Sequence, residues 1–109
     1  MTFKSPSVAL ACVAACLSLG TAGALAQDAQ TLYIKSLAAT CANCHGTNGK
    51  VVDGSSVPGL AGLPANYIVE QMNAFKSGAR PATVMHQLAK GYNDAQIAQI
   101  AAYFAAQKK

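Results

Sequence analysis

Two cysteines and a histidine stand close together at Cys41, Cys44 and His45, in the stretch CANCH. A helical turn places positions i, i+3 and i+4 on one face, so two thiols and an imidazole would point the same way. Such a set can hold a metal ion, perform thiol–disulfide exchange or anchor a haem, and each use needs different surroundings. The rest of the chain therefore decides between these uses.

The beginning of the chain is typical of an export signal. Lys4 precedes an apolar run, which ends in the small-x-small sequence ALA at Ala26. We therefore expect a signal peptide over residues 1–26, cleaved after Ala26, and a periplasmic domain over residues 27–109 with no membrane span. Two alternatives remain open: lipidation at Cys16, which follows small residues as in lipoprotein signals, and an uncleaved membrane anchor.

Export makes the cysteine count informative. The leader holds Cys12 and Cys16, so Cys41 and Cys44 are the only cysteines of the expected domain. A disulfide between residues three apart closes almost no loop and adds little stability. A domain of this size buries little apolar surface, and residues 27–109 contain no Trp and only two Phe. A large apolar cofactor is therefore expected to complete the core.

The hydrophobic pattern of the domain predicts an all-α fold, because no alternating run of β-branched residues is present. Helices are expected over residues 28–44, 64–77, 83–90 and 93–107. Between the first two lies a long loop rich in glycine, serine and proline, and loops of that length are usually functional. One domain without internal repeats follows from this pattern.

Each long helix carries an apolar stripe. The first stripe leads through Tyr33 and Leu37 to Cys41. The last helix begins with Asn93 followed by Gln96, which resembles a capping box. The stripes of the two later long helices are Ile68, Met72 and Phe75, and Ile97, Ile100, Ala101 and Phe104.

This helical context favours haem attachment at the cysteine motif. C-x-x-C-H is a haem c attachment pattern. A thiol–disulfide site would be expected beside a βαβ pattern, and no strands are predicted. A structural zinc site needs four ligands, and His86 is the only further histidine. We predict one haem c, bound covalently through Cys41 and Cys44, with His45 on its iron.

Three side chains are candidates for the sixth iron position. Met72 belongs to an apolar helical stripe, where methionine is more often core filler. Met85 follows the helix-breaking Pro81, where the chain can fold back over the haem, and a thioether there raises the reduction potential. His86 is the stronger donor and stands next to it. The sequence favours Met85 and leaves His86 open.

These residues resemble class I c-type cytochromes. The resemblance covers essentially the whole expected domain and lies in CANCHG, VPGLAGLPANY and FKSGARPATVMHQLAKGYNDAQIAQIAAYFAAQK. It is closest to the haem subunits of flavocytochrome c sulfide dehydrogenases. Leu63 departs from the subfamily, which often has Gln at this place.

The resemblance implies roles for individual residues. Cys41 and Cys44 would form the thioethers, with His45 as proximal and Met85 as distal ligand. The Pro58 carbonyl would accept a hydrogen bond from the second nitrogen of His45. The first and last helices would cross near a right angle, with Tyr103 or Phe104 at the crossing.

Charge limits the choice of partners. The chain has eight Lys and Arg, of which Lys4 lies in the leader, against four acidic residues, so the domain carries +3. The haem propionates lower this net charge further, which excludes a strong nucleic-acid footprint and indicates only mild electrostatic steering toward acidic partners. Lys50, Lys76, Arg80 and Lys90 are candidates for a docking rim. Tyr67 and Arg80 are candidates for contacts with haem propionates.

The function expected from the resemblance is periplasmic electron transfer, without catalysis of its own. The chain would be the cytochrome subunit of a sulfide dehydrogenase that accepts electrons from a FAD subunit. One alternative is a free electron shuttle. Another is a gas-binding or peroxidase-like haem protein with an open sixth position.

Overall fold

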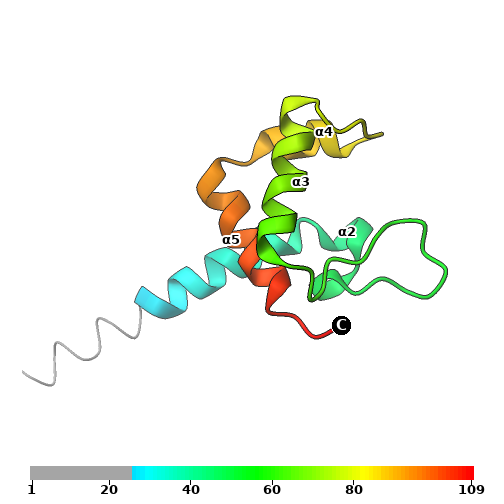
Figure 1. Ribbon diagram of the computed structural model, residues 1–109. Helices are drawn as coiled ribbons and strands as arrows, with labels where there is room; N and C mark the ends of the chain where they lie inside the picture. Colours follow the sequence, from blue (N-terminus) through cyan, green and yellow to red (C-terminus); the bar gives the residue numbers. More distant parts are fainter. Residues whose placement is uncertain (1–25) are drawn as a thin grey trace, which may run out of the picture. The chain divides into compact units, whose positions relative to one another are not determined.

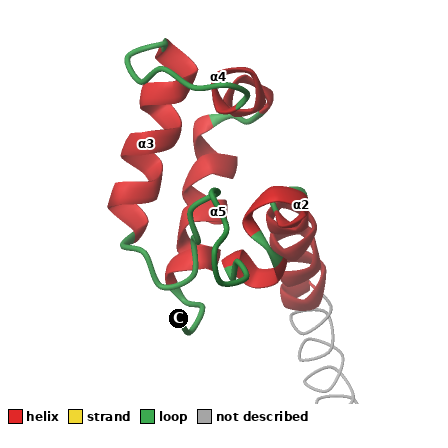
Figure 2. Ribbon diagram, turned by 90° about the vertical axis from the view of Figure 1, so that its right-hand side faces the viewer, coloured by secondary structure: helices red, strands yellow, loops and turns green. Residues whose placement is uncertain are grey.

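The computed structural model describes residues 26–109, which are mainly helical and contain no strand (Figures 1 and 2). The all-α prediction is therefore confirmed. Residues 26–39 are helical. The following elements are α2 (Ala42–His45), the 3-10 helix η1 (Thr47–Gly49), α3 (Ala65–Ser77), α4 (Met85–Leu88), the 3-10 helix η2 (Ala89–Gly91) and α5 (Asp94–Ala105).

The expected signal peptide lies outside the described residues, apart from Ala26. Residues 34–109 form one compact unit, and the described residues that precede them belong to another. No helix within residues 26–109 is long and apolar enough to cross a membrane.

Helix α3 packs beside α5 and also contacts α4, and both views show α4 near one end of α3 (Figures 1 and 2). The core lies between these helices, and the predicted stripe residues fill it: Ile68, Met72, Ile97, Ile100, Ala101 and Phe104 are all buried. Phe75 is only partly buried. Its exposed ring face is covered instead by Arg80, whose Cζ lies 4.6 Å from the ring centroid.

Local signals set the ends of the two long helices. The side chain of Asn93 accepts a hydrogen bond from Gln96 N at 2.9 Å, and Asn93 N donates to Gln96 Oε1 at 3.0 Å. This is the predicted capping box, and it begins α5 at Asp94. Helix α3 ends at Gly78, whose φ of 82° is left-handed.

The predicted first helix over residues 28–44 is wrong in two details. A turn at Thr40 and Cys41 separates the helical residues 26–39 from α2. The buried residue of this segment is Ala38, at 4% exposure, whereas Tyr33 is 42% exposed. Leu37 and Cys41 of the predicted stripe are partly buried against the core, so the stripe is wrong at Tyr33. The small side chain of Ala38 allows the closest approach.

The third predicted helix is also shorter than expected. Its α-helical part begins at Met85 rather than Thr83, because Val84 has a non-helical φ of −133°. The segment then continues as η2 and ends at Gly91.

The long loop after α2 is fixed to the rest of the unit. Gly49 O accepts hydrogen bonds from Leu60 N at 2.8 Å and from Ala61 N at 3.2 Å, which closes the loop on itself. Gly62 N donates to Phe104 O at 2.9 Å, at the end of α5. The loop therefore holds a defined position between α2 and α3.

Candidate functional site

The cysteine motif forms one helical turn. Cys41 is the N-cap of α2 and has helical φ and ψ of −83° and −17°. His45 N donates to Cys41 O at 2.9 Å, and Cys44 N lies 3.3 Å from the same oxygen. Residues i, i+3 and i+4 of one turn share a face. Both cysteines are free thiols, so both sulfurs are available to a cofactor on that face.

The imidazole of His45 is oriented by a residue of the long loop. Its Nδ1 lies 2.7 Å from the carbonyl oxygen of Pro58. A carbonyl oxygen can only accept, so Nδ1 donates the proton and Nε2 keeps its lone pair. Such a bond fixes the ring of a metal-binding histidine and raises its basicity. His45 is thus prepared to bind a metal through Nε2.

The surroundings of Cys41 do not suit thiol–disulfide exchange. Burial raises the pKa of the Cys41 thiol, and a hydrogen bond with Thr40 opposes this only in part. Reactive thiols need a lowered pKa, because the thiolate is the nucleophile. A zinc site is not supported either, because no group of three or more His, Cys, Asp or Glu among the described residues could hold a metal ion.

The candidates for the opposite ligand lie in different environments. Met72 is 8% exposed and belongs to the core cluster, which occupies it with packing. Met85 is the first residue of α4 and is partly buried against that core. The neighbouring His86 has a buried Nδ1 without a hydrogen-bond partner in the described part of the chain.

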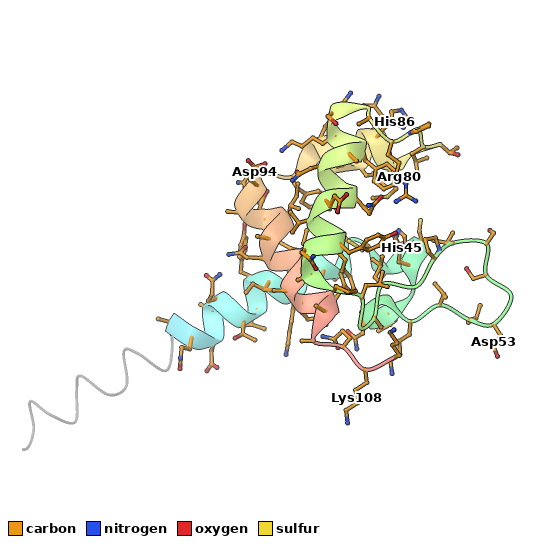
Figure 3. All side chains as sticks on the ribbon, viewed as in Figure 1. His45, Asp53, Arg80, His86, Asp94 and Lys108 are labelled. Carbon is orange, nitrogen blue, oxygen red and sulfur yellow. The ribbon has the colours of Figure 1, made fainter. Side chains whose placement is uncertain are left out.

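The elements that carry the candidate ligands lie apart from each other. Helix α4 lies near one end of α3, whereas α2 lies level with the lower part of α3 and is separated from it in Figure 2 (Figures 1 and 2). His45 and His86 are on the same side of α3, which is the side facing away from α5 (Figure 3). Met85 comes from the same short helix as His86.

Four large apolar side chains are exposed on the long loop, on α3 and at α4. They are Val52 of the long loop, Tyr67 of α3, Val84 directly before α4 and Leu88 of α4, each exposed by 44% or more. Two free thiols on one helical turn and an imidazole oriented by Pro58 together fit a covalently attached haem.

The proposed docking rim is only partly free. Lys76 Nζ donates to Tyr92 O at 2.8 Å and pairs with Asp94 at 3.3 Å, so its charge serves the junction between α3 and α5. Lys50, Arg80 and Lys90 are exposed. Tyr67 is 44% exposed.

Two polar contacts near the motif were not foreseen from the sequence. Thr40 Oγ1 lies 2.6 Å from Tyr92 Oη, next to Cys41. Tyr103 Oη donates to Asn48 Oδ1 at 2.6 Å, and so connects α5 to η1. Both pairs join residues more than fifty positions apart, and no local pattern identifies such partners.

Comparison with known proteins gives consistent results. The family model "Cytochrome c" matches residues 26–108. The chain is 38% identical to the thiosulfate dehydrogenase electron acceptor of Thiomonas intermedia over 90 residues, which are 81% of this chain and 42% of that protein. It is 43% identical to the cytochrome subunit of sulfide dehydrogenase of Chlorobaculum tepidum over 68 residues, 62% of this chain and 60% of the relative.

A third relative is cytochrome c4 of Pseudomonas aeruginosa, with 36% identity over 92 residues, which are 84% of this chain and 45% of the relative. The chain thus spans less than two thirds of the length of each of these three relatives.

Proposed function

The chain belongs to the cytochrome c family of electron-transfer proteins with covalently bound haem c, and from this premise we propose that His45 and Met85 bind its iron and that it accepts electrons from a sulfur-compound dehydrogenase. The observation that carries the proposal is the hydrogen bond from His45 Nδ1 to Pro58 O at 2.7 Å. This bond leaves the lone pair of His45 on Nε2, where it can bind a metal, and His45 directly follows Cys44.

Each residue of the site has a role in this proposal. Cys41 and Cys44 hold the haem through thioether bonds, and Pro58 fixes the plane of the His45 ring. Met85 fills the opposite position with a neutral thioether. Haem iron supplies a one-electron couple, and methionine opposite histidine raises its potential. With both positions filled there is no place for a substrate, so the protein passes electrons and catalyses no reaction of its own.

The names of two relatives support the choice of donor. One is called an electron acceptor of thiosulfate dehydrogenase, and the other a cytochrome subunit of sulfide dehydrogenase. We propose the second arrangement for this chain, with a FAD-containing subunit as donor. The first arrangement, a free carrier reduced in passing encounters, is the alternative. Both place the domain of residues 27–109 in the periplasm, after removal of residues 1–26.

The two arrangements differ in size and in reductant. Gel filtration of the native protein, followed at haem and flavin absorbance, is expected to show both cofactors in one peak. Sulfide should then reduce the haem in that peak. Haem that elutes alone, at the size of one small domain, and is reduced only when a separate dehydrogenase is added would contradict the subunit arrangement and favour the free carrier.

The axial ligands are tested separately. In the proposed arrangement the wild-type protein does not bind carbon monoxide or cyanide at ordinary rates, and Met85→Ala binds both. His86→Ala, the matched control next to it, should behave as wild type. Rapid binding by the wild-type protein, left unchanged in Met85→Ala, would instead indicate a gas-binding or peroxidase-like protein with an open position.

A further inference from the structure

Arg80 lies directly after α3, and its backbone is attached to the last turn of that helix. Arg80 N donates to Ala74 O at 3.0 Å, after Gly78 has turned the chain with a φ of 82°. In this common helix C-terminus, backbone N–H groups of the residues after the helix donate to its last carbonyl oxygens. The position of the Arg80 Cα is therefore set by the helix end.

The guanidinium of Arg80 is also held in place. Its Nη1 donates to the side-chain oxygen of Gln71 at 2.5 Å, and its Cζ lies 4.6 Å from the centroid of the Phe75 ring. Gln71 and Phe75 are i and i+4 on α3, so they offer one continuous surface for the side chain. An arginine on a protein surface normally keeps its rotamer freedom in water. Here a neutral amide and an aromatic face have already removed much of it.

The charge of this ordered guanidinium is not neutralised by the protein. Within residues 26–109 the one ion pair joins Lys76 to Asp94. No acidic residue occurs between Gln71 and Asn93. Guanidinium has five N–H donors, and Gln71 accepts only from one nitrogen. The remaining donors form a fork that matches a carboxylate.

The free fork lies on the side of α3 where the haem is expected. Figure 3 shows Arg80 between His86 and His45, on the side that faces away from α5. We propose that Arg80 binds a propionate carboxylate of the haem, and that Gln71 and Phe75 are positioning residues for this contact. The inference rests on the proposed attachment of haem at Cys41 and Cys44, but not on which residue binds the iron opposite His45.

Such a contact has a consequence for the iron. An ionised propionate stabilises ferric over ferrous haem, because the ferric form carries one more positive charge. A guanidinium bound to the propionate offsets this effect and raises the reduction potential. Losing one charge at a partly screened site changes the ratio of reduced to oxidised haem by roughly tenfold at a fixed potential. For a one-electron couple this corresponds to a fall of about 59 mV in midpoint potential.

The test compares Arg80→Gln, Arg80→Lys and Lys108→Gln in the full haem protein. Lys108→Gln removes the same charge at a residue that lies away from Arg80 (Figure 3). Midpoint potentials come from spectroelectrochemical titration, and resonance Raman bands of propionate bending report the carboxylate directly. Arg80→Gln should lower the potential and shift the propionate band. Arg80→Lys should keep most of the potential while the band still shifts, because lysine keeps the charge and loses the fork.

Two results would overturn the proposal. In the first, Arg80→Gln has the same potential as Lys108→Gln. In the second, its potential falls while the propionate band is unchanged, which would make Arg80 a remote charge. Gln71→Leu is a further variant, for the case that Arg80→Gln folds poorly. It keeps the charge of Arg80 but releases its guanidinium, and it should therefore show part of the fall in midpoint potential and part of the shift of the propionate band. If Met85 does not bind the iron, the wild-type protein should bind carbon monoxide. That result tests the proposed ligand and does not affect the test of Arg80.

Discussion

Gly49 offers a sharp test of how the loop after the cysteine motif is packed against α5. Its φ is +76°, and an added Cβ would stand 2.8 Å from Ala61 N and 2.9 Å from Phe104 Cδ1. Ala61 N donates to Gly49 O, and Phe104 is 1% exposed, so neither neighbour can move away easily. We therefore expect Gly49→Ala to be strongly destabilising.

A matched control separates the two causes of this effect. Gly54 has a φ of +81°, but an added Cβ there meets nothing within 4 Å. Both alanine variants incur the left-handed backbone cost of about 1–2 kcal/mol. Only Gly49→Ala adds the cost of overpacking, about 1–3 kcal/mol. The expected losses are about 2–5 kcal/mol for Gly49→Ala and about 1–2 kcal/mol for Gly54→Ala, from a total stability of about 5–15 kcal/mol.

The assay is thermal unfolding of the haem protein, followed by far-ultraviolet circular dichroism. In a domain of this size 1 kcal/mol corresponds to about 4–8 °C in Tm, so Gly49→Ala should melt at least about 4 °C below Gly54→Ala. Equal melting temperatures for the two variants would refute the close contact between Gly49, Ala61 and Phe104.

Three further predictions concern α5. Phe104→Ala removes the largest fully buried side chain and should lower the free energy of unfolding in urea by about 3–5 kcal/mol; a loss below 1 kcal/mol would contradict its place in the core. Asn93→Ala should cost about 1 kcal/mol in the same assay and Asn93→Asp almost nothing, since aspartate also caps helices; equal losses would argue against the capping box. Tyr103→Phe loses the hydrogen bond to Asn48 Oδ1 and should cost about 1 kcal/mol in the same assay; an unchanged free energy of unfolding would argue against this bond.

The sequence predicted the features that depend on neighbours along the chain. The helical class, the capping box at Asn93 and the end of α3 at Ser77 follow from local backbone geometry, and all three are present. The spacing of Cys41, Cys44 and His45 likewise fixes their common face, because one helical turn brings i, i+3 and i+4 together. Even the buried face of α5 could be read from its period.

What the sequence could not determine are the contacts made across long separations and between elements. Ala38, rather than Tyr33, is buried, because close packing is decided by the partner surface. Lys76 pairs with Asp94, which removes it from the docking rim. The clamp of Gln71 and Phe75 on Arg80 appears only when Gly78 turns the chain back over α3. Periodicity and spacing report one element at a time, so these partners were decided by the tertiary structure alone.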